Sequence, residues 1–294
     1  MTRSNGLGLV LLVVTSGCAT NLSAMQTGKT LQPGQIRVGA AVGVYVPAGQ
    51  AVNALGHGVN QAKKGVEAAQ NKENFTVSEA DQEAMLTTAL ALAVLPPSTS
   101  WEINGRYGVA KDFDVGLRYG MNALRVDAKY RVFHGGDRDG EGQGGRKSFD
   151  FAVGLGVSRY FFSNPVTEVL EKVKLGNFDR WDVEVPLYVS ADFSPYFGIY
   201  FSPKYVYSRT TVELRLLEVV EACSCLEEKL QLPSEVNMHF VGATGGIRAG
   251  LPKLSVYAEL TGGNTFVNPQ IMGKARNLGG VTLYPSIGLA GTFR

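Results

Sequence analysis

The sequence is poor in the residues and motifs that catalysis, nucleotide binding and nucleic-acid binding require. Of its 294 residues only three are Cys and three are His, and neither a Gly-x-Ser-x-Gly motif nor a phosphate-binding loop occurs. The formal net charge is only +2, from 28 Lys and Arg against 26 Asp and Glu, with no basic run. We therefore expect a non-enzyme with no catalytic residues, no cofactor, no metal and no nucleic-acid partner.

Long apolar runs are also missing after the N-terminus. The longest is Ala89 to Leu95, which Pro96-Pro97 ends, whereas a membrane-spanning helix needs about 20 apolar residues. Only helices and closed barrels satisfy the main chain in lipid. If this chain crosses a membrane, it must therefore cross as β-strands.

The N-terminus reads as an export signal. Arg3 precedes an apolar stretch from Gly6 to Val14, which is too short to span a bilayer, and Thr15-Ser16-Gly17-Cys18 follows. These last four residues resemble a bacterial lipobox, although Thr15 stands where Leu is commonest. The resemblance implies a signal peptide at 1–17 and a lipidated Cys18 that starts an N-terminal linker at 18–34. Ala19 implies outer-membrane sorting; the alternative is an ordinary signal peptide with an incidental Cys.

Period-two alternation of apolar and polar residues runs through the rest of the chain. In 124–132 the odd positions are Arg125, Asp127, Lys129 and Arg131, and the even positions are apolar or Tyr. Such alternation is typical of β-strands with one polar and one apolar face. The other clear strands are 101–109, 113–119, 149–157, 183–189 and 281–293, and weaker ones are 35–46, 196–207, 236–249 and 254–260.

The connections between these ten strands are unequal in length. Tight turns at 111–112, 194–195 and 251–253 alternate with long inserts at 47–99, 162–181, 211–235 and 262–279. Short turns at one rim and long loops at the other are typical of outer-membrane barrels. The short loop 120–123 and the Gly-rich connection 134–147 depart from the alternation.

By this pattern residues 35–294 resemble a small bacterial outer-membrane β-barrel protein. The resemblance implies an all-β fold, an antiparallel up-and-down transmembrane β-barrel of about ten strands, in contact with outer-membrane lipid and anchored through Cys18. Such barrels usually end on an aromatic residue, whereas here Phe293 is penultimate. The oligomeric state is left open.

The polar faces of the strands are assigned to the lumen. Eight basic and eight acidic residues then face one another, which favours paired charges and a largely closed lumen, because unpaired buried charge is costly. Inward Gly39, Gly43, Gly154 and Gly156 could make room for long Arg side chains. A narrow pore is the alternative. The predicted lumen residues are Arg37, Glu102, Arg106, Asp114, Arg118, Arg125, Asp127, Lys129, Arg131, Asp150, Asp182, Glu184, Asp192, Lys204, Arg248 and Glu259.

The opposite orientation would make a lipid-anchored, lipocalin-like periplasmic carrier of apolar ligands. Its cavity would be lined by Phe149, Phe151, Val153, Leu155, Val183 and Val185. The strand number, the unequal loops and the aromatic residues near strand ends favour the membrane barrel.

The insert 47–99, between the first two strands, is predicted to be a helical hairpin. Val59, Ala62, Val66 and Ala69 recur at helical spacing, and Ser78 with Asp81 is a capping arrangement that opens a second helix. The hairpin could be a lid, a contact for a surface or envelope protein, or a self-packed loop.

Few residues are left for chemistry. Cys223 and Cys225 could close a disulfide, and no His or further Cys near them supports a metal site. A barrel hydrolase would need a base, for which His239 is the candidate. The sequence therefore predicts a structural or surface-interaction role rather than an enzyme.

Overall fold

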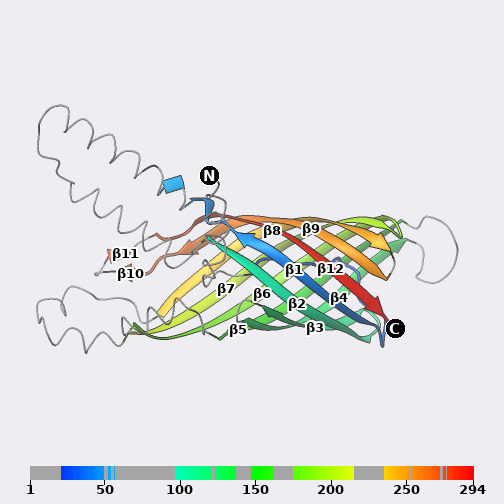
Figure 1. Cartoon of the computed structure of the whole chain (residues 1–294), viewed down its shortest axis with the longest axis horizontal. Coiled ribbons are helices and arrows are strands. Elements are labelled where there is room, and N and C mark those ends of the chain that lie inside the picture. The colour runs from blue at the N-terminus through cyan, green and yellow to red at the C-terminus, as the bar shows by residue number, and fades with distance from the viewer. Residues whose placement is uncertain are drawn as a thin grey trace, which may run out of the picture.

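The computed structural model shows a closed antiparallel β-barrel (Figure 1). The structure describes residues 21–49, 52–53, 56, 97–120, 123–136, 147–161, 175–214, 235–251, 253–271, 274–275 and 277–294. Ten strands close in the order β1-β12-β9-β8-β7-β6-β5-β4-β3-β2, which confirms the predicted ten-stranded barrel. They are β1 Ile36–Tyr45, β2 Ser98–Ala110, β3 Phe113–Gly120, β4 Ala123–Gly136, β5 Ser148–Tyr160, β6 Leu175–Ser194, β7 Phe197–Leu214, β8 Glu235–Leu251, β9 Leu254–Val267 and β12 Gly280–Phe293.

Closure is made by β1, which pairs with the next strand in the chain and with the last one. Ala40 lies opposite Ile103 of β2 on one side and opposite Leu289 of β12 on the other. Every neighbouring pair is antiparallel, so each strand of the barrel has a partner on both sides. Closure of this kind removes the exposed sheet edges on which other chains could pair.

Alternation along the strands sets which side chains face the lumen. In β12, Thr282, Tyr284 and Ser286 point inward and are buried, whereas Val281 and Leu289 are exposed on the outside. The orientation is the reverse of the lipocalin-like one, because Phe149, Leu155 and Val185 are exposed rather than lining a cavity.

The two rims of the barrel differ. We call the rim with the β2–β3, β4–β5, β6–β7 and β8–β9 connections the turn side; β1 starts there and β12 ends there (Figure 1). The opposite rim is the loop side. The β2–β3 turn is tight because Asp112 takes a left-handed φ of 64°. The main-chain carbonyl of Asp112 also accepts a hydrogen bond from the N–H of Arg131 in the neighbouring strand β4.

Most strands are longer than the sequence predicts; β4, for example, runs to Gly136, inside the connection assigned to 134–147. The largest extensions are in β6, β7 and β9. Positions 175–181 and 211–214 were assigned to inserts. Instead, β6 begins at Leu175 and β7 continues to Leu214, and these two residues are partners in the ladder between the strands. The alternation continues there, with buried Arg180 beside exposed Trp181. Likewise β9 extends to Val267, and the hairpin β10 Gln270–Ile271 with β11 Lys274–Ala275 follows it.

Several predicted features fall outside the described residues. They are the signal peptide 1–17, Cys18, Cys223, Cys225 and nearly all of the 47–99 hairpin. In the part of the chain that the structure describes, no helix has the length and hydropathy needed to cross a bilayer.

Candidate functional site

The lumen holds a stretch of the chain itself. The residues from Leu22 to Gly28 lie inside the barrel and are buried. Their apolar side chains include those of Leu22, Ala24 and Met25, and Leu31 further along the chain is buried as well. Near the turn side, Gly34 donates a hydrogen bond to the carbonyl of Gly108 at 2.8 Å, just before the chain turns into β1. The segment predicted to be a linker is thus packed in the barrel from Asn21 onward. We call residues 21–34 the lumen segment.

The middle of the lumen segment is held through its main chain by charged wall residues. The Arg118 guanidinium donates to the carbonyls of Ser23 at 2.9 Å and Ala24 at 3.0 Å. The Glu259 carboxylate accepts from the main-chain N–H groups of Ala24 and Met25. These are charge-assisted hydrogen bonds, the stronger kind in proteins.

The turn-side half of the segment is held in the same way. Lys129 donates to the carbonyls of Thr27 at 3.2 Å and Lys29 at 2.6 Å. Asp114 accepts from the N–H of Leu31 at 2.9 Å. Most of these bonds go to main-chain atoms of the segment, while the side chains of Leu22, Ala24 and Met25 pack in buried clusters with wall residues.

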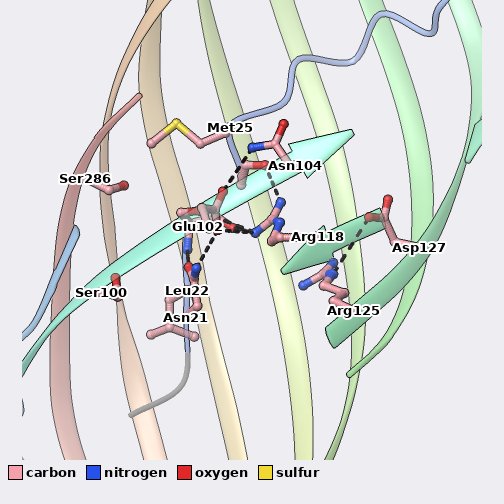
Figure 2. Close-up of polar contacts among 12 residues, drawn as sticks. Asn21, Leu22, Met25, Ser100, Glu102, Asn104, Arg118, Arg125, Asp127 and Ser286 are labelled. Atoms are coloured by element: carbon pink, nitrogen blue, oxygen red, sulfur yellow. Dashed lines mark hydrogen bonds and ion pairs between the residues drawn. The ribbon is translucent and has the colours of Figure 1, made fainter. Parts of the chain in front are cut away.

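The loop-side end of the segment is Asn21. Its side-chain amide donates to the Glu102 carboxylate, and its side-chain oxygen accepts from the Tyr284 hydroxyl at 3.1 Å. Glu102 also pairs with Arg118 at 3.2 Å, so wall and segment share one network (Figure 2). The side chain of the next residue, Leu22, belongs to a buried apolar cluster that also contains Tyr45, Val206, Phe240 and Tyr284.

The wall charges also pair with one another. Arg106 bridges Asp114 at 2.6 Å and Asp127 at 2.5 Å, and Arg125 pairs with Glu184. All five side chains are buried. Charges so far from water are tolerated only when paired and hydrogen-bonded.

The structure places thirteen of the sixteen predicted lumen residues in buried positions and the other three at half-buried positions near the turn side. The half-buried ones are Arg37, Arg131 and Arg248; the buried ones are Glu102, Arg106, Asp114, Arg118, Arg125, Asp127, Lys129, Asp150, Asp182, Glu184, Asp192, Lys204 and Glu259. Two sets of charges lie on the turn side: Arg131 and His134 contact Asp150, with Asp112 also paired to Arg131, and Asp192 pairs with Lys29 and Arg248.

Sequence reasoning missed Arg180 and the lumen segment. Arg180 is buried and pairs with Asp182 at 2.9 Å, and the alternation could have revealed it, since it shares the parity of Asp182. The four inward glycines serve different neighbours: a Cβ on Gly156 would lie 2.7 Å from an Arg125 nitrogen, whereas one on Gly43 would meet the Tyr284 ring. Of the four, Gly156 alone makes room for an arginine.

The two described histidines do not form a catalytic pair with a nucleophile. His239 lies on the outer face, where its Nδ1 is 2.7 Å from the Tyr205 hydroxyl, while Asp182 faces the lumen. His134 Nδ1 is 2.6 Å from Asp150, and Ser148 bonds to that same carboxylate. Among the described residues, no cluster of three His, Cys, Asp or Glu side chains is placed to hold a metal ion.

A small pocket remains on the loop side of the lumen. It lies between Asn21 and the ends of β3 and β4, where Gly120 and Ala123 line it, and Arg125 and Tyr160 form part of its wall.

No known protein family matches the chain, and no curated protein matches it. Solved structures with some similarity include Neisserial surface protein A, with 10% identity, a TM-score of 0.32, and coverage of 88% of this chain and 96% of that one. The attachment invasion locus protein Ail of Yersinia pestis has 8% identity, a TM-score of 0.30, and coverage of 89% and 100%. The N-terminal β-barrel domain of Pseudomonas aeruginosa OprF has 7% identity, a TM-score of 0.26, and coverage of 90% and 100%. The fold assignment therefore rests on the strand pairing of this chain.

Proposed function

We propose that this protein is a bacterial outer-membrane β-barrel lipoprotein with a closed lumen, anchored through Cys18, with a structural or surface-interaction role. The observation that carries the proposal is that the chain fills its own lumen while its outer wall is apolar. A filled lumen argues against a pore, and an apolar exterior argues for lipid as the surrounding medium.

The outer wall supports the membrane placement. Apolar side chains are exposed on every strand of the barrel, among them Val42, Ile103, Leu117, Val126 and Leu260. This surface is far more continuous than the patches that monomeric proteins expose to water, and an outward apolar band is typical of outer-membrane barrels.

Aromatic side chains lie near both rims, as expected of residues at the two lipid–water interfaces. On the loop side, Trp101 and Tyr119 make an edge-on contact with ring centroids 5.9 Å apart. On the turn side, Phe193 and Phe197 stack with centroids 6.1 Å apart. The apolar band between the two belts is the part we place in the hydrocarbon.

The closed lumen supports a role that depends on surfaces rather than transport or catalysis. The interior is occupied by the lumen segment, and the described histidines lack a nucleophile. The insert 47–99 is the segment we propose as the contact for an envelope or surface protein.

Heat-modifiability tests the proposal directly. We expect the mature protein in purified membranes to resist carbonate extraction and to migrate faster on an unboiled gel than after boiling. A Cys18→Ser variant should behave in the same way, because the strands hold it in lipid. Release of that variant by carbonate would show that the lipid was the only anchor and would overturn the barrel placement.

Outward substitutions should show a dependence on depth. Val126 lies in the middle of the ladder between β3 and β4 and is exposed, so Val126→Arg is expected to destabilise the folded barrel by about 2–4 kcal/mol, the cost of Arg at the bilayer midplane. The matched control is Val109→Arg near the turn-side end of β2, where the expected cost is about 0–1 kcal/mol. Urea unfolding in lipid vesicles measures both. Equal effects would contradict the membrane placement.

A further inference from the structure

The height of Asn21 in the barrel indicates where the preceding chain leaves it. Asn21 bonds to Glu102 of β2, and a Cβ on Gly120 would lie 2.7 Å from the Glu102 Cα. Gly120 ends β3 and pairs with Ala123, which begins β4. Asn21 is therefore level with the loop-side ends of β3 and β4.

Along this part of the rim, from β3 to β5, the strands end lower than β6 and β7 do. Ala123 is the register partner of Tyr160 of β5, and Tyr160 is the register partner of Arg180 of β6. Beyond that level β6 continues to Leu175, which pairs with Leu214 of β7. A chain leaving the lumen over β3 and β4 thus passes a shorter wall than one leaving over β6 and β7.

The pocket described above lies on this route. It starts at Asn21 and is bounded by Gly120 and Ala123 at the rim. Arg118 and Glu184 belong to its inner wall. The route from Asn21 toward this stretch of rim is accordingly the place where the structure leaves room beside the segment.

The opposite route is closed by distance. The lumen segment takes the thirteen steps from Asn21 to Gly34 to reach the turn side, where Gly34 bonds to Gly108. Cys18 precedes Asn21 by three residues, which span about 11 Å at most when fully extended. Three residues cannot return to the turn side through a lumen that Leu22 to Leu31 already occupy.

We propose that the chain before Asn21 leaves the barrel at the loop side over β3 and β4. Because the long loops of outer-membrane barrels are extracellular and the short turns periplasmic, this puts Cys18 and its lipid at the outer leaflet of the outer membrane. This inference rests on the proposed function, since it takes the lipoprotein signal and the membrane barrel as given. The lipid joins Cys18 Sγ to a glyceryl carbon of a phospholipid, the phosphorylated headgroup leaves with the thiol proton, and no oxidation state changes. Closure of β1 on β12 must then enclose the lumen segment.

Two epitope insertions test the placement in full-length protein. One lies between Ala19 and Thr20, and its matched control lies between Pro252 and Lys253 in the turn-side β8–β9 connection. We expect an antibody to bind the first epitope on intact cells and the second only after permeabilisation. Binding of both only after permeabilisation would overturn the threading, and exposure of the control alone would overturn the outer-leaflet placement.

Mass spectrometry of the purified mature chain tests the lipid itself. We expect a chain that begins at Cys18 and carries the added mass of acylated glycerol, lost in Cys18→Ser. A chain without that mass would overturn the lipid placement even if the first epitope is exposed. Both epitope variants must also be heat-modifiable. An unmodifiable wild-type protein would instead show that the proposed membrane barrel had failed.

Discussion

Deletion of residues 21–33 is expected to turn the closed barrel into a conducting one. The deletion keeps Cys18 at one end and Gly34, with its bond to Gly108, at the other. It empties the centre of the lumen, and Arg118, Lys129 and Glu259 lose the main-chain partners that they hold in the intact protein. Water then takes the place of the peptide along a polar wall.

The expected effect on ion flux is large. Barrels with a polar, water-filled interior conduct, so we expect the deleted protein to show discrete current steps in planar bilayers and a total membrane current about tenfold or more above that with wild type. Wild-type protein should show no stable current steps. The deleted protein must still shift on an unboiled gel, so that any current comes from folded barrels.

A matched control separates the peptide backbone from its side chains. Replacing Leu22 to Leu31 with a Gly-Ser sequence of equal length keeps the main-chain groups that Arg118, Lys129 and Asp114 bind. This variant should therefore stay closed. A folded deletion variant that carries no current would show that wall side chains alone close the lumen.

The alternation in sequence was sufficient to predict the strands and their two faces, whereas the strand number, the unequal loops and the aromatic residues near strand ends were needed to choose which face points inward. Arg125, Asp127 and Lys129 alternate with Val126 and Ala128, and that period places the two sets on opposite faces of the strand. The same rule, carried further, would have extended β6 to Arg180 and beyond. The predictable part of this protein is thus the part in which side chains themselves carry the structural pattern.

The lumen segment could not be predicted in this way. Its bonds from Ala24, Met25, Thr27 and Leu31 use main-chain N–H and C=O groups, which every residue other than Pro provides equally. The wall residues that bind it, such as Arg118 and Glu259, are charged. Because the predicted lumen residues include equal numbers of acidic and basic side chains, their charges could all be assigned to pairs within the wall, with no need for a bound segment. The linker prediction therefore had no side-chain signal against it.

Loss of the Arg125 charge is expected to be among the most damaging single changes in the wall. Arg125 pairs with Glu184, the two side chains are each only 7% exposed, and Gly156 lies against the guanidinium. Arg125→Met leaves the Glu184 carboxylate buried without this partner, and breaking a buried pair costs about 3–5 kcal/mol. We expect the folded band on unboiled gels to be lost at a distinctly lower temperature and urea unfolding to shift in parallel.

Two comparisons decide whether burial of an unpaired charge is the cause. The double variant Arg125→Met with Glu184→Leu removes both charges at similar volume, so it should regain much of the lost stability, because apolar replacements of buried pairs are often neutral. Arg209→Met breaks an exposed pair with Glu235, 2.7 Å apart, and should change stability little. If the double variant is as unstable as the sum of its single changes, lost packing around Gly156 rather than an unpaired charge limits the wall. If Arg209→Met is equally damaging, the lumen pairs have no special role in holding the barrel closed.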